Sequence, residues 1–316
     1  MKLWAKAALS AALLALLFLL LPWAQVRDAL VRLPPAVWLG VLAGFAAGHA
    51  VGIAKWRLFV NSARAGLGWR DATLCYAAGL FANLCLPSIV GGDVLRLGLA
   101  ARFTRRPEAA LWGGIMDRIS DLLALALLVT TGGLLARRSL QGWLGEVLLV
   151  VVLVVVGLLV LALPLVLRRP LARWPRRLRR PIGRSLVGLR QLARHPRPAA
   201  VGLALSLLIQ SSFVLLNAWL GRSVGIEVSL AVWFLIWPLA KIASLLPISL
   251  GGLAVREASL AALLLPFGVP LARSVVCSLL WQTVLIAGGL LGGLLWLGLN
   301  RSRRLPFRAS KGPLPA

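Results

Sequence analysis

The chain has 316 residues, of which 60% are hydrophobic and 14% are charged, and its formal net charge is +26. Soluble domains average about 45–50% apolar and about 25% charged residues, so this composition excludes a water-soluble enzyme or binding domain. The basic residues lie between long apolar runs, where they orient membrane spans and attract anionic headgroups, and this placement argues against nucleic-acid binding.

Two apolar segments begin the chain, at residues 7–24 and 35–54. Each can cross a bilayer as a helix, and tryptophans near their ends suit the headgroup region. Basic residues precede the first segment as in a signal peptide, but no small-x-small cleavage site follows it. We therefore expect two retained spans.

The next apolar segment, residues 72–101, is interrupted by Pro87 and by the pair Gly91 and Gly92. Proline and paired glycines break helices, and broken backbone at membrane depth must be buried in protein or line a cavity. This segment is therefore predicted to be a re-entrant hairpin that returns to its starting side.

Spans three and four are predicted at residues 108–136 and 143–167. Residues 168–198 follow with eleven arginines and no acid, so the positive-inside rule places this loop in the cytoplasm. The fifth span is predicted at residues 199–220.

A second hairpin, broken at Pro247 and at Gly251 and Gly252, is predicted at residues 230–265. The sixth span follows at residues 271–299, and its Gly288, Gly289, Gly292 and Gly293 predict close helix packing. Residues 300–316 are polar and basic and are predicted to be a disordered tail.

The two hairpins are related by an internal repeat. LPSIVGGDVLR at residues 86–96 and LPISLGGLAVR at residues 246–256 share Leu, Pro, Gly, Gly and Arg at equal offsets. Three full crossings separate the hairpins, so the repeat is inverted, with halves near 1–140 and 141–299 in one transmembrane domain, residues 1–299. Inverted repeats with interrupted helices are typical of transporters, although duplication for stability alone is the alternative.

The charge distribution predicts the orientation. With the amino terminus inside, the cytoplasmic segments hold 25 of the 35 basic residues, Lys55 among them, and the outer segments hold six. Four lie within apolar segments: Arg96, Arg118, Lys241 and Arg256. We expect a multi-pass protein of the cytoplasmic membrane with both termini in the cytoplasm.

Charged side chains inside apolar segments need partners or a wet cavity, since an ionised group at the bilayer centre costs about 2.5–3.5 kcal/mol. Asp93 and Arg96 are three residues apart and can pair on a helix. In span three, Asp117 and Asp121 flank Arg118, and two acids that share one arginine suit either a proton or cation relay or a structural ion network.

In the second hairpin, the adjacent Arg256 and Glu257 point different ways on a helix, so each is expected to pair elsewhere. Arg96 and Arg256 hold equivalent repeat positions, and two guanidinium groups suit an anionic phospholipid headgroup. Lys241 either snorkels or lines a cavity. We find no cofactor or metal motif and no catalytic constellation, so we expect no cofactor, no metal and no enzymatic activity.

Three blocks occur in a fixed order: LPSIVGGDVLR, then DRISDLL at residues 117–123, then LPISLGGLAVREASL at residues 246–260. Over residues 7–299 the chain resembles the lysylphosphatidylglycerol synthase transmembrane region, or flippase-like domain family. The resemblance implies lipid flipping of the kind attributed to the membrane domain of bifunctional members, without the soluble domain that attaches the amino acid. The positions it implies are Pro87, Gly91, Gly92, Asp93, Arg96, Arg118, Asp121, Gly251, Gly252, Arg256 and Glu257; Asp117 stands where the family often has Glu.

The residues and the resemblance together predict an all-α polytopic membrane protein with six spans and two re-entrant hairpins. Its predicted function is to bind and translocate a phospholipid or a polyprenyl-phosphate lipid. The alternative is a non-transporting membrane partner of a lipid-modifying or glycosyl-transferring enzyme, with the loop at residues 168–198 as the docking surface. The expected ligands are membrane lipids with anionic headgroups.

Overall fold

The computed structural model describes residues 34–85, 91–104, 106–136, 196–244 and 255–301. Within these ranges the chain is helical and has no strand, as predicted for an all-α membrane protein. Several predictions fall outside the described residues: spans one and four, Pro87, Pro247, Gly251, Gly252, the arginine-rich loop and the basic tail.

Four of the described helices are long and apolar enough to cross a membrane. They are α3 (Pro35–Ser62), α6 (Pro107–Leu135), α9 (Pro196–Ser223) and α12 (Leu271–Arg301). Helices of 28 to 31 residues are about 42–46 Å long, more than the about 30 Å of hydrocarbon in a bilayer. The predicted second, third, fifth and sixth spans are therefore confirmed as long apolar helices.

Two pairs of shorter helices pack between the long ones. The first pair is α4 (Trp69–Cys85) with α5 (Gly91–Phe103), and the second is α10 (Leu230–Ser244) with α11 (Val255–Leu264). Helices of 10 to 17 residues are about 15–26 Å long, too short to cross the hydrocarbon.

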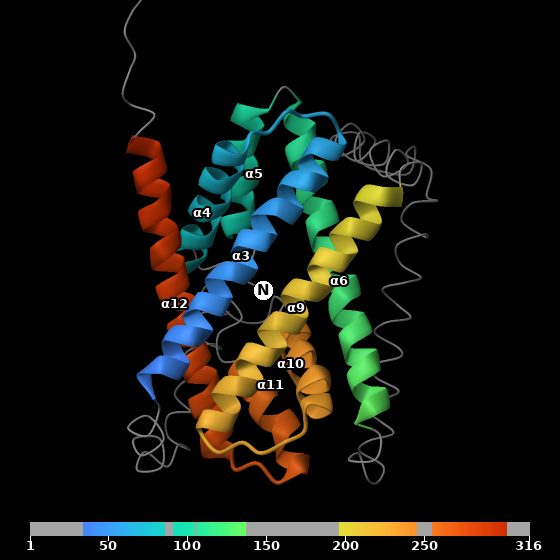
Figure 1. Cartoon of the computed structure of the whole chain (residues 1–316), viewed down its shortest axis with the longest axis vertical. Helices are drawn as coiled ribbons and strands as arrows, with labels where there is room; N and C mark the ends of the chain where they lie inside the picture. Colours follow the sequence, from blue (N-terminus) through green and yellow to red (C-terminus); the bar gives the residue numbers. More distant parts are fainter. Residues whose placement is uncertain (1–33, 86–90, 105, 137–195, 245–254, 302–316) are drawn as a thin grey trace, which may run out of the picture.

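The two short pairs enter the molecule from opposite ends. In Figure 1, α4 begins at the end where α3 stops and α5 leads back to it, whereas α10 and α11 occupy the other end. We name these the α4–α5 end and the α10–α11 end. The partners in each pair pack against each other, so the predicted re-entrant hairpins and their inverted arrangement match the described helices.

The glycine pair of the first hairpin belongs to a helix and not to the break. Helix α5 begins at Gly91, so Gly91 and Gly92 form its first turn. A Cβ on Gly92 would lie 2.2 Å from the carbonyl oxygen of Gly79 in α4 and 2.3 Å from Oδ1 of Asn83. The N–H of Gly92 donates a hydrogen bond to that Oδ1 at 3.1 Å. Gly92 therefore allows the backbones of α4 and α5 to touch.

Glycines of α12 serve the same purpose for neighbouring helices, as predicted. A Cβ on Gly288 would lie 2.2 Å from the ring of Phe45 in α3, and one on Gly292 would lie 3.1 Å from the carbonyl oxygen of Ala77 in α4. In lipid, no hydrophobic force drives helices together, so their association depends on close van der Waals packing. Glycine allows that packing because it has no side chain to separate the helices.

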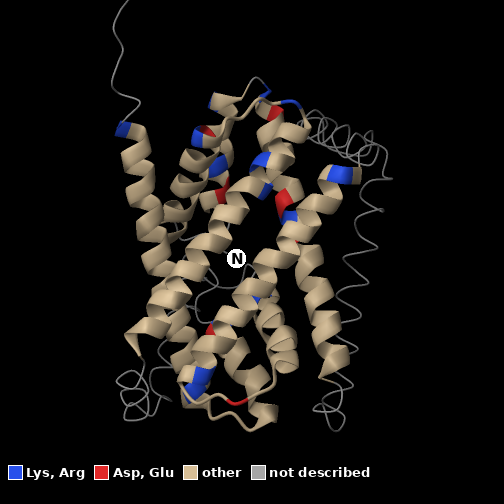
Figure 2. Cartoon of the chain, viewed as in Figure 1, with Lys and Arg blue, Asp and Glu red and all other residues tan. Residues whose placement is uncertain are grey.

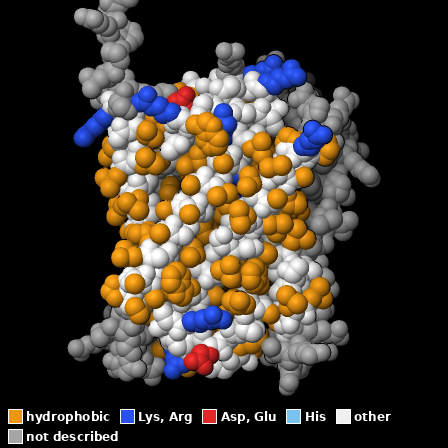
Figure 3. Space-filling view, in the orientation of Figure 1, with side chains coloured by type: hydrophobic (Ala, Val, Ile, Leu, Met, Phe, Trp, Pro, Cys, Tyr) orange, Lys and Arg blue, Asp and Glu red, His pale blue; other side chains and the backbone are white. Residues whose placement is uncertain are grey.

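The surface and the interior differ in where charge is found. Figure 3 shows apolar side chains across the middle of the visible face and most charged ones towards its two ends. Figure 2 shows in addition a group of acidic and basic residues inside the half that contains α4 and α5. Charged groups at membrane depth mark a functional site by default, because they are costly there.

Candidate functional site

A cavity of about 900 Å³ lies at the centre of the helices, and every described α-helix contributes to its wall. Its volume falls within the range of ligand pockets, about 300–1,000 Å³. Five cationic and three anionic side chains line it among the described residues, together with aromatic and aliphatic ones. The cavity therefore combines apolar walls with a surplus of positive charge.

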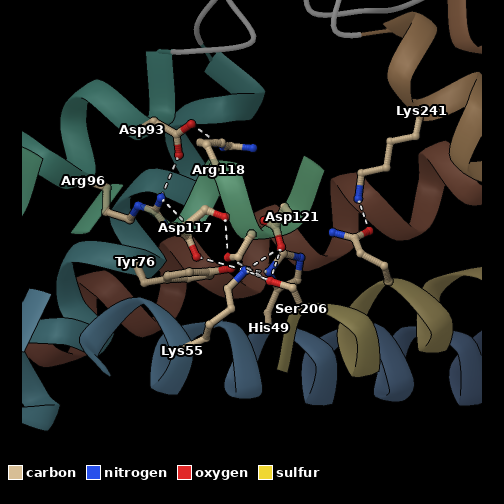
Figure 4. A network of polar contacts seen from close by, with 12 residues as sticks. His49, Lys55, Tyr76, Asp93, Arg96, Asp117, Arg118, Asp121, Ser206 and Lys241 are labelled. Carbon is tan, nitrogen blue, oxygen red and sulfur yellow. Dashed lines mark hydrogen bonds and ion pairs between the residues drawn. The ribbon is translucent and has the colours of Figure 1, made fainter. Parts of the chain in front are cut away.

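Lys55 is the hub of the ionised groups in the α4–α5 half. Its Nζ lies 3.0 Å from Oδ1 of Asp117 and 2.5 Å from Oδ1 of Asp121, both on α6. It also donates a hydrogen bond of 2.9 Å to the hydroxyl of Ser206 on α9, and that hydroxyl donates to Asp121. Lys55 is only 2% exposed, so three long helices meet at one buried ammonium group (Figure 4).

Arg96 extends this network into the first hairpin. Its Nη2 lies 3.0 Å from Oδ2 of Asp117 and 3.1 Å from Oδ1 of Asp93, and Asp93 in turn pairs with Arg118. The predicted pairing of Asp93 with Arg96 is confirmed. The result is a continuous ion chain of three cations and three acids, which we define by its six members: Lys55, Arg96, Arg118, Asp93, Asp117 and Asp121.

The expectation that Asp117 and Asp121 share Arg118 is wrong. Arg118 turns to Asp93 of α5, and the two acids share Lys55 instead. The side chain of Arg118 is 50% exposed, whereas those of Lys55 and Asp117 are 3% and 6% exposed. Arg118 therefore points away from the buried carboxylates, and α3 supplies their counter-ion.

The second hairpin holds its charges differently. Nη2 of Arg256 lies 2.6 Å from Oε1 of Glu257 and donates a hydrogen bond of 2.8 Å to Oε1 of Gln282 on α12. The expectation that Arg256 and Glu257 each pair elsewhere is therefore wrong. Adjacent residues diverge at Cβ, but the arginine side chain is long enough to curl back to its neighbour.

Lys241 was predicted either to snorkel or to line a cavity, and it lines the cavity from α10. Its Nζ donates a hydrogen bond of 2.7 Å to Oε1 of Gln210 and lies 5.0 Å and 5.5 Å from the ring centroids of Trp237 and Phe213. In Figure 4 it lies on the opposite side of Asp121 from Arg96. Among the described residues no carboxylate lies within ion-pair distance of it.

Several cavity residues were not predicted as site residues. Lys55 follows the predicted end of span two directly and was assigned to a loop, but α3 continues to Ser62 and places it inside. His49 carried no prediction, yet it contacts the hydroxyl of Tyr76 at 3.1 Å and lines the cavity. Gln210 accepts a hydrogen bond from Lys241, and Gln282 accepts one from Arg256. An amide side chain within an apolar span is the sequence feature that could have identified both glutamines.

One family model, described as the lysylphosphatidylglycerol synthase TM region, matches residues 3–293. The matched range contains both hairpins, the whole ion chain and all cavity-lining residues. Neither the curated proteins nor the solved structures include a significant match.

Proposed function

The chain belongs to the lysylphosphatidylglycerol synthase transmembrane-region family, a family of membrane proteins related to lipid handling, and on that basis we propose that it binds a phospholipid or polyprenyl-phosphate lipid and translocates it across the cytoplasmic membrane. The role is transport and not catalysis. The observation that carries the proposal is a central cavity into which hairpins from opposite ends both bring charged side chains.

Alternating access is supported by the arrangement of these hairpins. Arg96 of α5 and Arg256 of α11, which are equivalent in the repeat, line the same cavity. In transporters built from inverted repeats, interrupted helices meet at a central site that opens to one side at a time. We expect each hairpin to close the cavity at its own end of the molecule in turn.

Lateral access for a lipid is supported by the walls beside the first hairpin. Cys85, at the last residue of α4, and Ile286 of α12 are both exposed and both line the cavity. Leu80, Leu84 and Leu285 extend this apolar wall. A lipid whose headgroup enters the polar interior can keep its acyl chains against such a surface, where they lose no contact with apolar groups.

Transport is tested in reconstituted vesicles that contain a fluorescent phosphatidylglycerol, with the label on the outer leaflet destroyed by an impermeant reductant. Wild-type protein should make the protected inner pool accessible, and Arg256→Gln should abolish this movement. Arg256→Lys should retain part of it, because lysine keeps the charge but loses the bidentate fork. Vesicles with wild-type protein that move no lipid under any imposed gradient would contradict transport.

The alternative of a docking partner is favoured by the eleven arginines between residues 168 and 198. Changing these arginines to glutamine should leave lipid movement in vesicles intact if the chain is a transporter. Under the docking function, the same change should abolish the activity of a partner enzyme in cells, whereas Arg256→Gln should not. Comparison of the two sets of variants therefore shows whether function depends on the cavity, as in a transporter, or on the loop, as in a docking partner.

A further inference from the structure

We infer that the cavity recognises a phosphate-bearing anion through Lys241 and Arg256, on the side of the second hairpin, and that it excludes headgroups with net positive charge, including the lysylated phospholipid in the family's name. This inference rests on the proposed lipid-binding function and specifies the headgroup chemistry. The ion chain around Lys55 then serves as a fixed wall and not as the ligand site.

The cations of the ion chain are already neutralised. Lys55 contacts two carboxylates, Arg96 contacts two, and Arg118 contacts Asp93. The side chain of Arg96 is 5% exposed and its guanidinium carbon lies 4.9 Å and 5.1 Å from the ring centroids of Trp56 and Tyr76. A ligand phosphate would have to displace a buried carboxylate there and leave it uncompensated, which is strongly unfavourable.

Lys241 is in the opposite situation. Its Nζ donates a hydrogen bond to the neutral amide of Gln210 and lies near the aromatic rings of Phe213 and Trp237. A cation at membrane depth is stabilised by a counter-ion, because water is scarce there. Asp121 of the same cavity attracts Lys241, but no described carboxylate lies within ion-pair distance of it, and a bound phosphate supplies that direct counter-ion.

Arg256 and two glutamines complete the set of donors. Nη2 of Arg256 serves both Glu257 and Gln282, while its buried Nε, like that of Arg96, has no hydrogen-bond partner among the described residues. The side chain of Arg256 is the more accessible of the two, 16% exposed against 5% for Arg96. Gln210 and Gln282 both turn Oε1 towards a cation, so each side-chain NH2 remains a donor. Phosphate oxygens accept several such hydrogen bonds, and charge-assisted ones are the strongest.

The overall charge of the cavity discriminates between headgroups. Five cationic and three anionic side chains line it among the described residues, and Glu257 compensates Arg256, so one positive charge remains, at Lys241. A headgroup with net charge −1 neutralises the site. A lysylated headgroup adds a further cation to a low-dielectric space, where like charges repel strongly.

The test measures binding to the purified full-length chain in detergent by native mass spectrometry, with four probes: dioctanoyl phosphatidylglycerol, its lysylated form, dioctanoyl phosphatidylcholine and inorganic phosphate. Phosphatidylglycerol should bind at least about tenfold more tightly than the lysylated or choline lipid. If inorganic phosphate binds the protein and none of the three lipids does, the ligand is a soluble phosphate and not a lipid headgroup.

The variants Lys241→Gln and Arg256→Gln should each weaken phosphatidylglycerol binding about tenfold or more, since each removes a charged donor. Arg222→Gln is the matched control, because Arg222 is exposed in the last turn of α9 and lies outside the cavity wall. Lys241→Arg should keep most of the binding, because it keeps the positive charge. Retained binding in this variant would show that the loss in Lys241→Gln comes from the missing charge and not from misfolding. Equal binding of the lysylated lipid by the wild type, or unchanged binding by both glutamine variants, would overturn the inference.

This binding assay is independent of transport. A protein that prefers phosphatidylglycerol but moves no lipid in vesicles would support the inference and contradict the proposed function. A protein that translocates lipids without preference for anionic headgroups would support the proposed function and contradict the inference.

Discussion

At the scale of single residues, the position of Lys55 changes how the acids of α6 are understood. Without it, Asp117 and Asp121 would be two carboxylates four residues apart on one helix, with Arg96 as the buried cation in contact with Asp117. With it, the ion chain holds equal numbers of positive and negative groups and ties α3, α5 and α6 together. Its first effect is therefore on stability.

We expect Lys55→Met to destabilise the protein strongly, since removing one partner of a buried ion pair costs about 3–5 kcal/mol. The double variant Lys55→Met with Asp121→Asn restores charge balance and should recover part of the loss. Melting temperatures in detergent compare the wild type, the single variant and the double variant. A single variant that melts with the wild type would show that the ion chain contributes little to stability.

Cys85 offers a chemical probe of the cavity. It is exposed and lines the cavity, whereas Cys75 and Cys277 are buried. A bulky maleimide should therefore modify Cys85 alone and block lipid binding by occupying space, and bound phosphatidylglycerol should slow the reaction. Intact-protein mass spectra follow the modification, and Cys85→Ser is the unreactive control. Complete modification with undiminished lipid binding would place Cys85 away from the ligand.

At the scale of elements, the contact between α4 and α5 depends on a single missing side chain. Gly92 faces the backbone and Asn83 of α4, whereas Gly98 of the same helix is exposed, and a Cβ added there would have no atom within 4 Å. Both positions are helical. The pair therefore separates the effect of packing from that of helix propensity.

We expect Gly92→Ala to push α4 and α5 apart and to lower the melting temperature and lipid transport together. Gly98→Ala should be neutral or should stabilise the helix by up to about 1 kcal/mol, because alanine has the higher helix propensity. Melting curves and vesicle assays of the two variants provide the comparison. Equal behaviour of the two would mean that the hairpin tolerates separation of its helices.

The hairpins could be predicted because their signals are local. Proline interrupts a helix within a few residues, and the repeat of LPSIVGGDVLR predicted the second hairpin from the first. Helix α5 nevertheless begins at Gly91, so the glycine pair was wrongly assigned to the break. The end of α3 could not be predicted in this way. Lys55 and Arg57 flank Trp56, a pattern typical of the membrane interface, yet the helix continues to Ser62.

The pairing of charges was predictable only where it follows helix spacing. Asp93 and Arg96 pair at three residues' separation, as expected from one helix alone. Arg118 had an equally spaced acid, Asp121, but pairs with Asp93, 25 residues away in the chain. Which of several acids a cation meets depends on how helices rotate against one another, and that rotation is fixed by packing contacts across the whole bundle.

At the scale of the whole molecule, the fold shows which end of the helices carries the excess of basic residues. The ends of α3 and α12 and the start of α9 all lie at the α4–α5 end (Figure 1). With Lys55 moved inside, 24 of the 35 basic residues remain in segments assigned to the cytoplasm and six in outer segments. The positive-inside rule then predicts that the α4–α5 end faces the cytoplasm.

Helix α9 allows this orientation to be tested at both ends. Arg197 and Arg222 are exposed near its start and in its last turn, respectively. In a Cys85→Ser background, Arg222→Cys should react with an impermeant maleimide on intact cells, whereas Arg197→Cys should react only after the cells are opened. The reverse pattern of labelling would invert the topology.

The charge of Lys241, which has no ion-pair partner in the described part of the chain, also bears on what drives transport. A membrane potential does about 2.3 kcal/mol of work on each elementary charge per 100 mV. A cavity with one surplus cation carries no net charge when it holds a headgroup of charge −1, but carries a positive charge when it reorients empty. Voltage then acts on the empty return step and not on the loaded one, so an electrically polarised membrane could set the direction of lipid movement without any coupled ion.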